Sequence, residues 1–196
     1  MRVRIGAALG AALVSLAAVA TVTTQADASP TSTSAGFTAQ LRSAGFTGQQ
    51  SAALRGEIDR DLATLHGRQV TPNQIVTGDN SVITYPLPGD KYAHAFGDGL
   101  NGNDPRTPFE LCSYGAFCGW KYANYEGKGF THADCADFYE IPNGFNSGGS
   151  WMNNQTHHYT TSFWGKGYTY LSTSPKAYYA QPHGNWHPVW YISNDC

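Results

Sequence analysis

The chain has 196 residues, of which 13% are charged, and its formal net charge is −2 at pH 7 with neutral histidines. This weak negative charge excludes bulk electrostatic attraction to nucleic acid or to an anionic membrane. The 22 glycines and the aromatic content of 13% favour short strands and many turns over a bundle of helices.

Residues 1–28 have the segment order of a secretory signal peptide. Arg2 and Arg4 precede an uncharged apolar run from Ile5 to Ala20, and small residues follow up to Ala28. The run is shorter than the roughly 20 residues that a membrane-spanning helix needs. We therefore expect cleavage after Ala28 and a secreted, extracellular protein that no longer contacts the membrane.

Residues 29–88 are expected to form an N-terminal extension with one helix and one hairpin. Residues 29–36 are small and polar, with nothing to pack. Four apolar residues then recur at helical spacing: Leu54, Ile58, Leu62 and Leu65. Gly67 is the expected end of this helix. The helix either docks on the following domain or binds a partner.

Two β-type runs, 74–77 and 81–85, flank Gly78, Asp79 and Asn80, a pattern typical of a hairpin. Residues 89–108 are rich in Gly, Asp, Asn and Pro and are predicted to be a linker. We place the domain boundary in this segment.

Residues 109–196 contain all five tryptophans and all four cysteines. Short β-type runs alternate with turns, which predicts an antiparallel sandwich. The runs cover residues 117–122, 138–141, 150–153, 159–164, 168–172 and 186–192.

Four cysteines in an exported chain predict two disulfides, and three pairings are open. We favour Cys112–Cys118, because the short gap closes a tight loop, and hence Cys135–Cys196.

An aromatic and glycine pattern follows Cys118. Trp120, Tyr125 and Gly127 have a spacing that folds a strand end back, with two rings stacked at a corner and a glycine of positive φ. Together with the pair Cys112 and Cys118, this segment resembles the secreted bacterial peptidase-inhibitor family of the metalloproteinase-inhibitor type, which has the βγ-crystallin fold. The segment 148–156 and the helix-and-hairpin lead are also similar to that family.

The resemblance implies an all-β, βγ-crystallin-like Greek-key sandwich over 109–196. It also implies a non-enzymatic inhibitor that blocks an extracellular metalloendopeptidase sterically. The sequence departs from the family at Ser113, where a proline is usual. Known inhibitors present their binding loop across a second short disulfide, whereas Cys135 and Cys196 are far apart. No reactive-site residue is therefore carried over.

Crystallin-like domains can also bind calcium between their two Greek keys. Asn146 and Ser150 match part of that pattern, but no carboxylate accompanies them, so we expect weak Ca²⁺ binding at most and no other cofactor or metal. His132 and His187 are the candidates for a metal or for catalysis, and Asp134, Asp137 and Glu140 are the clustered carboxylates; we expect solvated or structural roles.

Trp186, Trp190 and Tyr191 lie in an aromatic C-terminal stretch. These side chains either fill the core or form an exposed platform that stacks on sugar rings or on a protein. Binding of polysaccharide or cell envelope without inhibition is therefore the alternative function.

Overall fold

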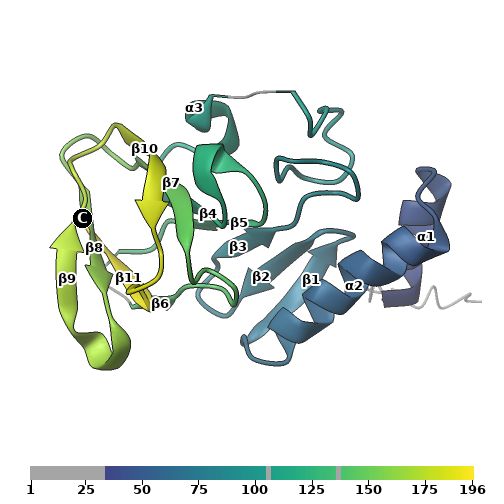
Figure 1. The fold of residues 1–196 in the computed structure, drawn as a ribbon, viewed down its shortest axis with the longest axis horizontal. Helices are drawn as coiled ribbons and strands as arrows, with labels where there is room; N and C mark the ends of the chain where they lie inside the picture. The colour runs from purple at the N-terminus through teal and green to yellow at the C-terminus, as the bar shows by residue number, and fades with distance from the viewer. Residues whose placement is uncertain (1–33, 105–106, 136–137) are drawn as a thin grey trace, which may run out of the picture. The chain divides into compact units, whose positions relative to one another are not determined.

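The structure is a computed structural model that describes residues 34–104, 107–135 and 138–196. The predicted signal peptide and residues 29–33 lie outside this part of the chain. The described residues are mostly β, as predicted, with two antiparallel sheets and few helices (Figure 1).

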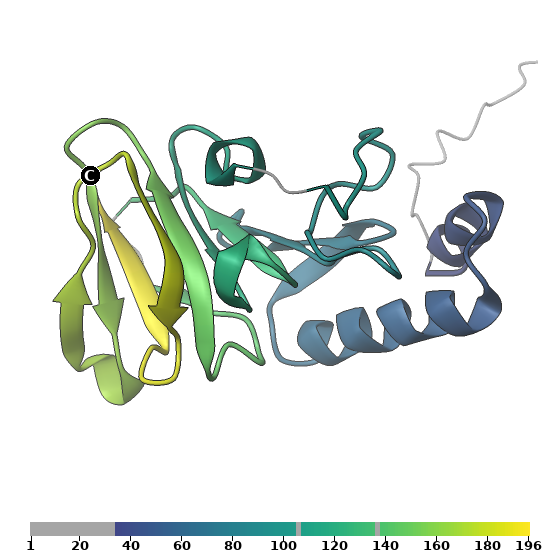
Figure 2. The ribbon, with the colours of Figure 1, turned by 45° about the horizontal axis from the view of Figure 1, so that its top comes forward.

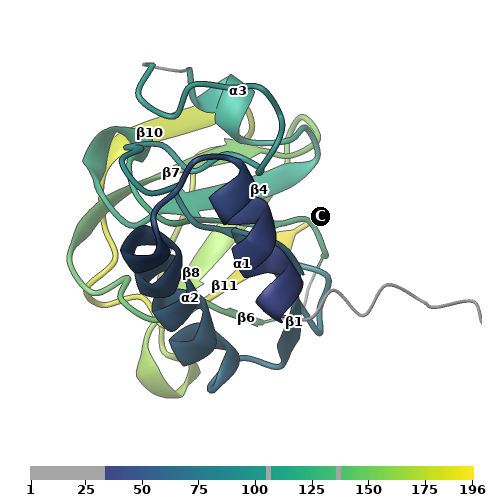
Figure 3. The ribbon, with the colours of Figure 1, turned by 90° about the vertical axis from the view of Figure 1, so that its right-hand side faces the viewer.

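Two helices come first, α1 over Ser34–Ser43 and α2 over Gly48–Leu62. Helix α1 was not predicted, and it buries Phe37 and Leu41. Helix α2 begins with a capping box, in which the Gln50 backbone N–H donates to the Thr47 hydroxyl at 3.2 Å and the Thr47 N–H donates to the Gln50 side chain at 2.9 Å. The helix lies beside the first strand of the sheet (Figure 3).

The predicted apolar face of α2 is confirmed, because Leu54 and Ile58 are buried and Leu62 and Leu65 pack against the same core. The expected helix end at Gly67 is wrong. The helix ends at Leu62, and Gly67 begins the first strand. A Cβ at Gly67 would lie 2.7 Å from the carbonyl oxygen of Val76, so this glycine allows two strands to approach closely.

The larger sheet has seven strands in the order β1-β2-β3-β5-β4-β7-β10. Their bounds are β1 Gly67–Thr71, β2 Gln74–Thr77, β3 Val82–Thr84, β4 Ala116–Trp120, β5 Gly129–His132, β7 Gly148–Asn154 and β10 Tyr179–Asn185. The predicted hairpin is confirmed, since β2 and β3 pair antiparallel with Ile75 opposite Ile83. Asn80 takes a φ of 60° in the turn.

The smaller sheet has four strands in the order β6-β11-β8-β9, namely β6 Tyr139–Glu140, β8 Thr160–Trp164, β9 Tyr170–Thr173 and β11 Tyr191–Asp195. It packs on the larger sheet beside β7 and β10 (Figure 2). Across this interface, the ring centroid of Phe163 lies 5.7 Å from that of Phe117 and 5.4 Å from that of Trp151. The two sheets therefore share one aromatic core.

Strands from both sides of the segment 89–108 belong to the same sheet. Strand β3 pairs with β5, and Ile83 lies opposite Phe130. Ile58, Ile83 and Phe130 are buried in one cluster. The segment itself folds back, because the backbone N–H groups of Lys91 and Tyr92 both donate to the carbonyl oxygen of Gly102. It ends in a short helix, α3, over Pro108–Leu111.

A buried ion pair also joins α2 to the sandwich. Lys128 Nζ donates to Asp61 Oδ2 at 2.7 Å and to the carbonyl oxygen of Asn143 at 2.7 Å, and both charged side chains are buried. Tyr85 donates its hydroxyl proton to the same Asp61 oxygen at 2.5 Å. Burial and the Asp61 carboxylate raise the pKa of Tyr85, so its hydroxyl stays a donor.

Candidate binding surfaces

The two predicted disulfides are present, Cys112–Cys118 and Cys135–Cys196. Within the described residues no cysteine is free. The first bond closes a loop whose ends are six residues apart, and the second joins residues 61 apart. Residues 112–118 are called the disulfide loop below.

The disulfide loop has a fixed base and an exposed tip. The half-cystines are buried, whereas Tyr114 is 68% exposed. The side-chain amide of Asn154 donates to the carbonyl oxygen of Cys112 at 2.8 Å. The N–H of Gly115 donates to the carbonyl oxygen of Asn154 at 2.8 Å, and Gly115 has a φ of 88° that favours glycine. A disulfide and two hydrogen bonds with Asn154 of β7 therefore hold the loop.

Aromatic and imidazole side chains surround the tip. The ring of exposed Tyr178 lies 6.2 Å from that of Tyr114. The ring of His157 lies 6.2 Å from that of Tyr178, and His158 packs on His157. The tip thus belongs to a surface that extends beyond the loop itself.

The predicted corner is present with different ring geometry. Gly127 has a φ of 79°, as predicted, and a Cβ there would lie 2.5 Å from the Tyr122 ring. The rings of Trp120 and Tyr125 are 5.2 Å apart at 81°, which is edge-to-face instead of the expected stack. Ser150 explains this packing, because its hydroxyl donates to the Tyr122 carbonyl at 2.7 Å and accepts the Tyr125 N–H at 2.8 Å.

This use of Ser150 bears on the predicted weak calcium site. Ser150 is buried, and its hydroxyl is engaged at the corner. The backbone carbonyl oxygen of Asn146 accepts a hydrogen bond from His187 Nδ1 at 3.3 Å. In the part of the chain that the structure describes, no group of three or more His, Cys, Asp or Glu could hold a metal ion.

Among the described residues weighed for catalysis, His132 and Asp134 make contacts within the fold. His132 is fully buried, and its Nδ1 lies 2.7 Å from the Ser81 hydroxyl. Asn194 donates to the carbonyl oxygen of Asp134 at 3.1 Å, while Glu140 lies on β6. Asp137 lies outside the described residues.

The three residues of the predicted platform differ in burial and in contacts. Trp186 is 1% exposed, and its indole N–H donates to the carbonyl oxygen of Trp120 at 2.8 Å, so it belongs to the core. Trp190 is 44% exposed, and Lys166 lies over its ring with Nζ 5.6 Å from the centroid. Tyr191 stacks on Tyr168 with ring centroids 4.6 Å apart.

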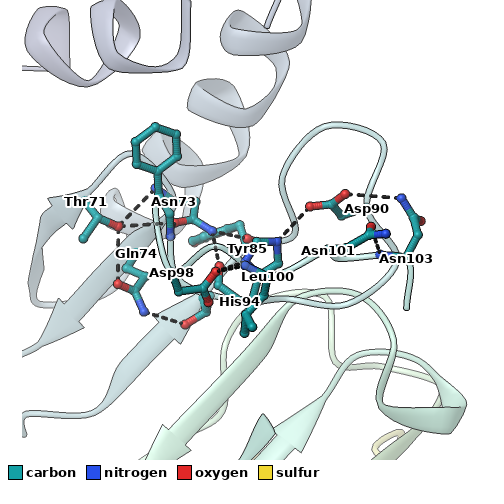
Figure 4. Close-up of polar contacts among 12 residues, drawn as sticks. Thr71, Asn73, Gln74, Tyr85, Asp90, His94, Asp98, Leu100, Asn101 and Asn103 are labelled. Atoms are coloured by element: carbon teal, nitrogen blue, oxygen red, sulfur yellow. Dashed lines mark hydrogen bonds and ion pairs between the residues drawn. The ribbon is translucent and has the colours of Figure 1, made fainter. Parts of the chain in front are cut away.

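The folded segment 89–104 holds a polar network that was not predicted (Figure 4). Buried His94 places Nδ1 2.8 Å from Asp98 Oδ1 and Nε2 3.0 Å from Asp90 Oδ2. Burial lowers the pKa of His94, but the hydrogen bonds to both carboxylates outweigh it and leave the pKa raised. Asn73 donates to the carbonyl oxygens of His94 and Tyr85, each at 2.7 Å.

A cavity of about 330 Å³ lies beside this network, and His94, Asp98, Trp120 and Thr131 are among its lining residues. Both ring nitrogens of His94 are engaged by carboxylates. The network therefore fixes the segment and leaves no ring nitrogen of His94 available to accept a proton from a ligand.

In the described residues, none of the helices has the length and apolar character needed to cross a membrane. Comparisons of the chain with family models, with curated proteins and with solved structures find no match.

Proposed function

We propose that the chain is a secreted, disulfide-bonded binding protein that inhibits an extracellular metalloendopeptidase by placing the disulfide loop in its cleft. The observation that carries this proposal is the contrast between a fixed loop base and a projecting Tyr114. The βγ-crystallin-like Greek key belongs to the same proposal. Its support is the corner at Trp120, Tyr125 and Gly127, with the positive φ at the glycine.

Preorganisation is the physical reason why such a loop would bind. A loop that is already fixed by a disulfide and by Asn154 loses little conformational entropy when a cleft closes around it. Tyrosine adds a large contact area with only two rotatable side-chain bonds, and it is enriched at the energetic centres of interfaces. Steric blockade needs no catalytic group on this chain.

Secretion is supported by composition and by cross-links. The signal-peptide pattern of residues 1–28 implies export. Two disulfides among the described residues suit an oxidising compartment.

Titration of a thermolysin-like peptidase with the exported chain tests the inhibition. We expect peptidase activity to fall when the exported chain is added at micromolar concentration or below. Tyr114→Ala should weaken inhibition about tenfold or more, because it removes the projecting ring. Tyr170→Ala is the matched control, since Tyr170 is also exposed but lies on β9.

Two results would overturn the proposal. One is full peptidase activity at micromolar wild-type chain. The other is equal inhibition by wild type and Tyr114→Ala, which would remove the disulfide loop from the mechanism. Near-ultraviolet circular dichroism of each variant verifies that the fold is intact.

A further inference from the structure

The outer side of the four-stranded sheet carries exposed aromatic side chains. Alternation along the strands points Phe163 and Ile192 into the core, so Trp164 and Tyr191 point outward. The register places Trp164 beside both Tyr191 on β11 and Tyr170 on β9. Five side chains form what we call the aromatic face: Phe138, Trp164, Tyr168, Tyr170 and Tyr191.

These five rings are in continuous contact. The centroid of Trp164 lies 5.4 Å from Tyr170 and 5.2 Å from Phe138. Phe138 lies 4.8 Å from Tyr168, which stacks on Tyr191 at 4.6 Å with 22° between the planes. Although Tyr191 and Phe138 both contact the Tyr168 ring, 54% of Tyr168 stays exposed to solvent.

A polar border runs along the same strands. The Asp195 carboxylate accepts hydrogen bonds from Ser162 at 2.8 Å and from Thr160 at 3.0 Å. The indole N–H of Trp164 donates to the Ser193 hydroxyl at 3.0 Å, which joins the border to the aromatic face. Exposed Glu140 lies opposite Tyr191 in the register of β6 and β11.

We propose that the aromatic face is a binding site for a neutral polysaccharide with β-linked pyranose rings. Axial C–H groups on one side of such a ring carry partial positive charge, and they match the negative π face of Tyr168. The ring edges carry hydroxyl donors, which the Glu140 and Asp195 carboxylates can accept.

The charges of the face favour this occupant over other classes. The aromatic face and its border combine the Glu140 and Asp195 carboxylates with hydroxyl groups, while the neighbouring Lys166 holds its ammonium over the Trp190 ring. Two carboxylates beside one ammonium give this surface no excess of positive charge for phosphate-rich polymers or anionic lipid. The aromatic side chains fix one another through their ring contacts before any ligand binds. Binding therefore costs little side-chain entropy.

This site is distinct from the disulfide loop, and it goes beyond the proposed inhibition. A chain with both sites would be held on polysaccharide while Tyr114 stayed available to a peptidase. The two activities are therefore separable by mutation.

Retention of the exported chain on insoluble chitin and cellulose, with calorimetric titration of chitohexaose and cellohexaose, tests the site. We expect the wild type to bind at least one polysaccharide and its hexasaccharide. The double variant Tyr168→Ala/Tyr170→Ala should bind about tenfold or more weakly, because two ring surfaces are lost. Tyr168→Phe keeps the ring and should bind within about twofold of the wild type.

Tyr114→Ala is the matched control and should retain full polysaccharide binding. Failure of wild type to bind either polysaccharide, or equal binding by the double variant, would overturn the proposal. A third result would also overturn it: the double variant changes the oligomeric state measured by light scattering, but saccharide binding is unchanged. The aromatic face would then contact a second copy of the chain and not a saccharide. Peptidase titration of the same variants separates this outcome from failure of the inhibition.

Discussion

The N-terminal part of the chain, from α1 to β3, contains no cysteine, whereas residues 112–196 contain all four. The C-terminal part is cross-linked at Cys112–Cys118 and at Cys135–Cys196. The N-terminal part is held instead by sheet pairing, by the Asp61–Lys128 ion pair and by the shared core. Covalent bonds act mainly by restricting the unfolded chain, while buried polar pairs act in the folded state and depend on charge.

The largest expected effect comes from the long-range disulfide. Loop-closure entropy predicts that Cys135→Ser/Cys196→Ser lowers the free energy of unfolding by about 4 kcal/mol, against about 2 kcal/mol for Cys112→Ser/Cys118→Ser. The difference follows from separations of 61 and six residues. Urea denaturation of both double variants measures it. Equal losses would show that strain or residual structure, and not loop length, sets the stabilisation.

Breaking the buried ion pair is expected to have the next largest effect. Lys128→Met leaves the Asp61 carboxylate buried with the Tyr85 hydroxyl as its remaining partner. We expect the free energy of unfolding to fall by about 3 kcal/mol, because an uncompensated buried charge is costly.

Urea denaturation provides the measurement, and Lys176→Met serves as a control at an exposed lysine. Asp61→Leu combined with Lys128→Met should recover part of the loss, since no charge is then left buried. If the single variant matched the wild type, the N-terminal part would not depend on this pair.

The smallest expected effect is a pH dependence of the free energy of unfolding that comes from His94. Because the folded state raises the pKa of His94, its stabilisation is fully present below the unfolded value of about 6.5 and is lost as pH rises through the raised folded pKa. The free energy of unfolding should therefore decrease as pH rises from about 6.5 through the raised folded pKa of His94.

His94→Gln should flatten this decrease while Asp90 and Asp98 remain. Denaturation at a series of pH values compares the two proteins. An identical slope for wild type and variant would mean that the imidazolium does not hold the segment 89–104.

Sequence patterns predicted the features that depend on local spacing. The apolar face of α2, the β2–β3 hairpin and the positive φ of Gly127 each follow from residues close together in the chain. Strand β10 was missed because Pro182 and Gly184 interrupt its β pattern. Both are tolerated because β10 is an edge strand with a register shift between Gln181 and Gly184.

Long-range partners could not be predicted from spacing. Asp61 lies between the apolar positions of the helix in sequence, and only the fold brings Lys128 to it. Trp186 and Tyr191 share a tryptophan- and tyrosine-rich stretch, yet one fills the core and the other faces outward. Phe138 and Tyr168, which contact each other in the aromatic face, lie far from residues 186–191 in the sequence, so local spacing could not place them beside Tyr191.

The pairing of β3 with β5 has a consequence for proteolysis of the chain. A cut in the exposed part of 89–104 would leave two fragments that still share a sheet and a core. Denaturing electrophoresis would separate the fragments, whereas gel filtration under native conditions would elute them together. A nicked chain would thus keep its fold, and loss of the leading fragment would expose the edge of β5 to self-association.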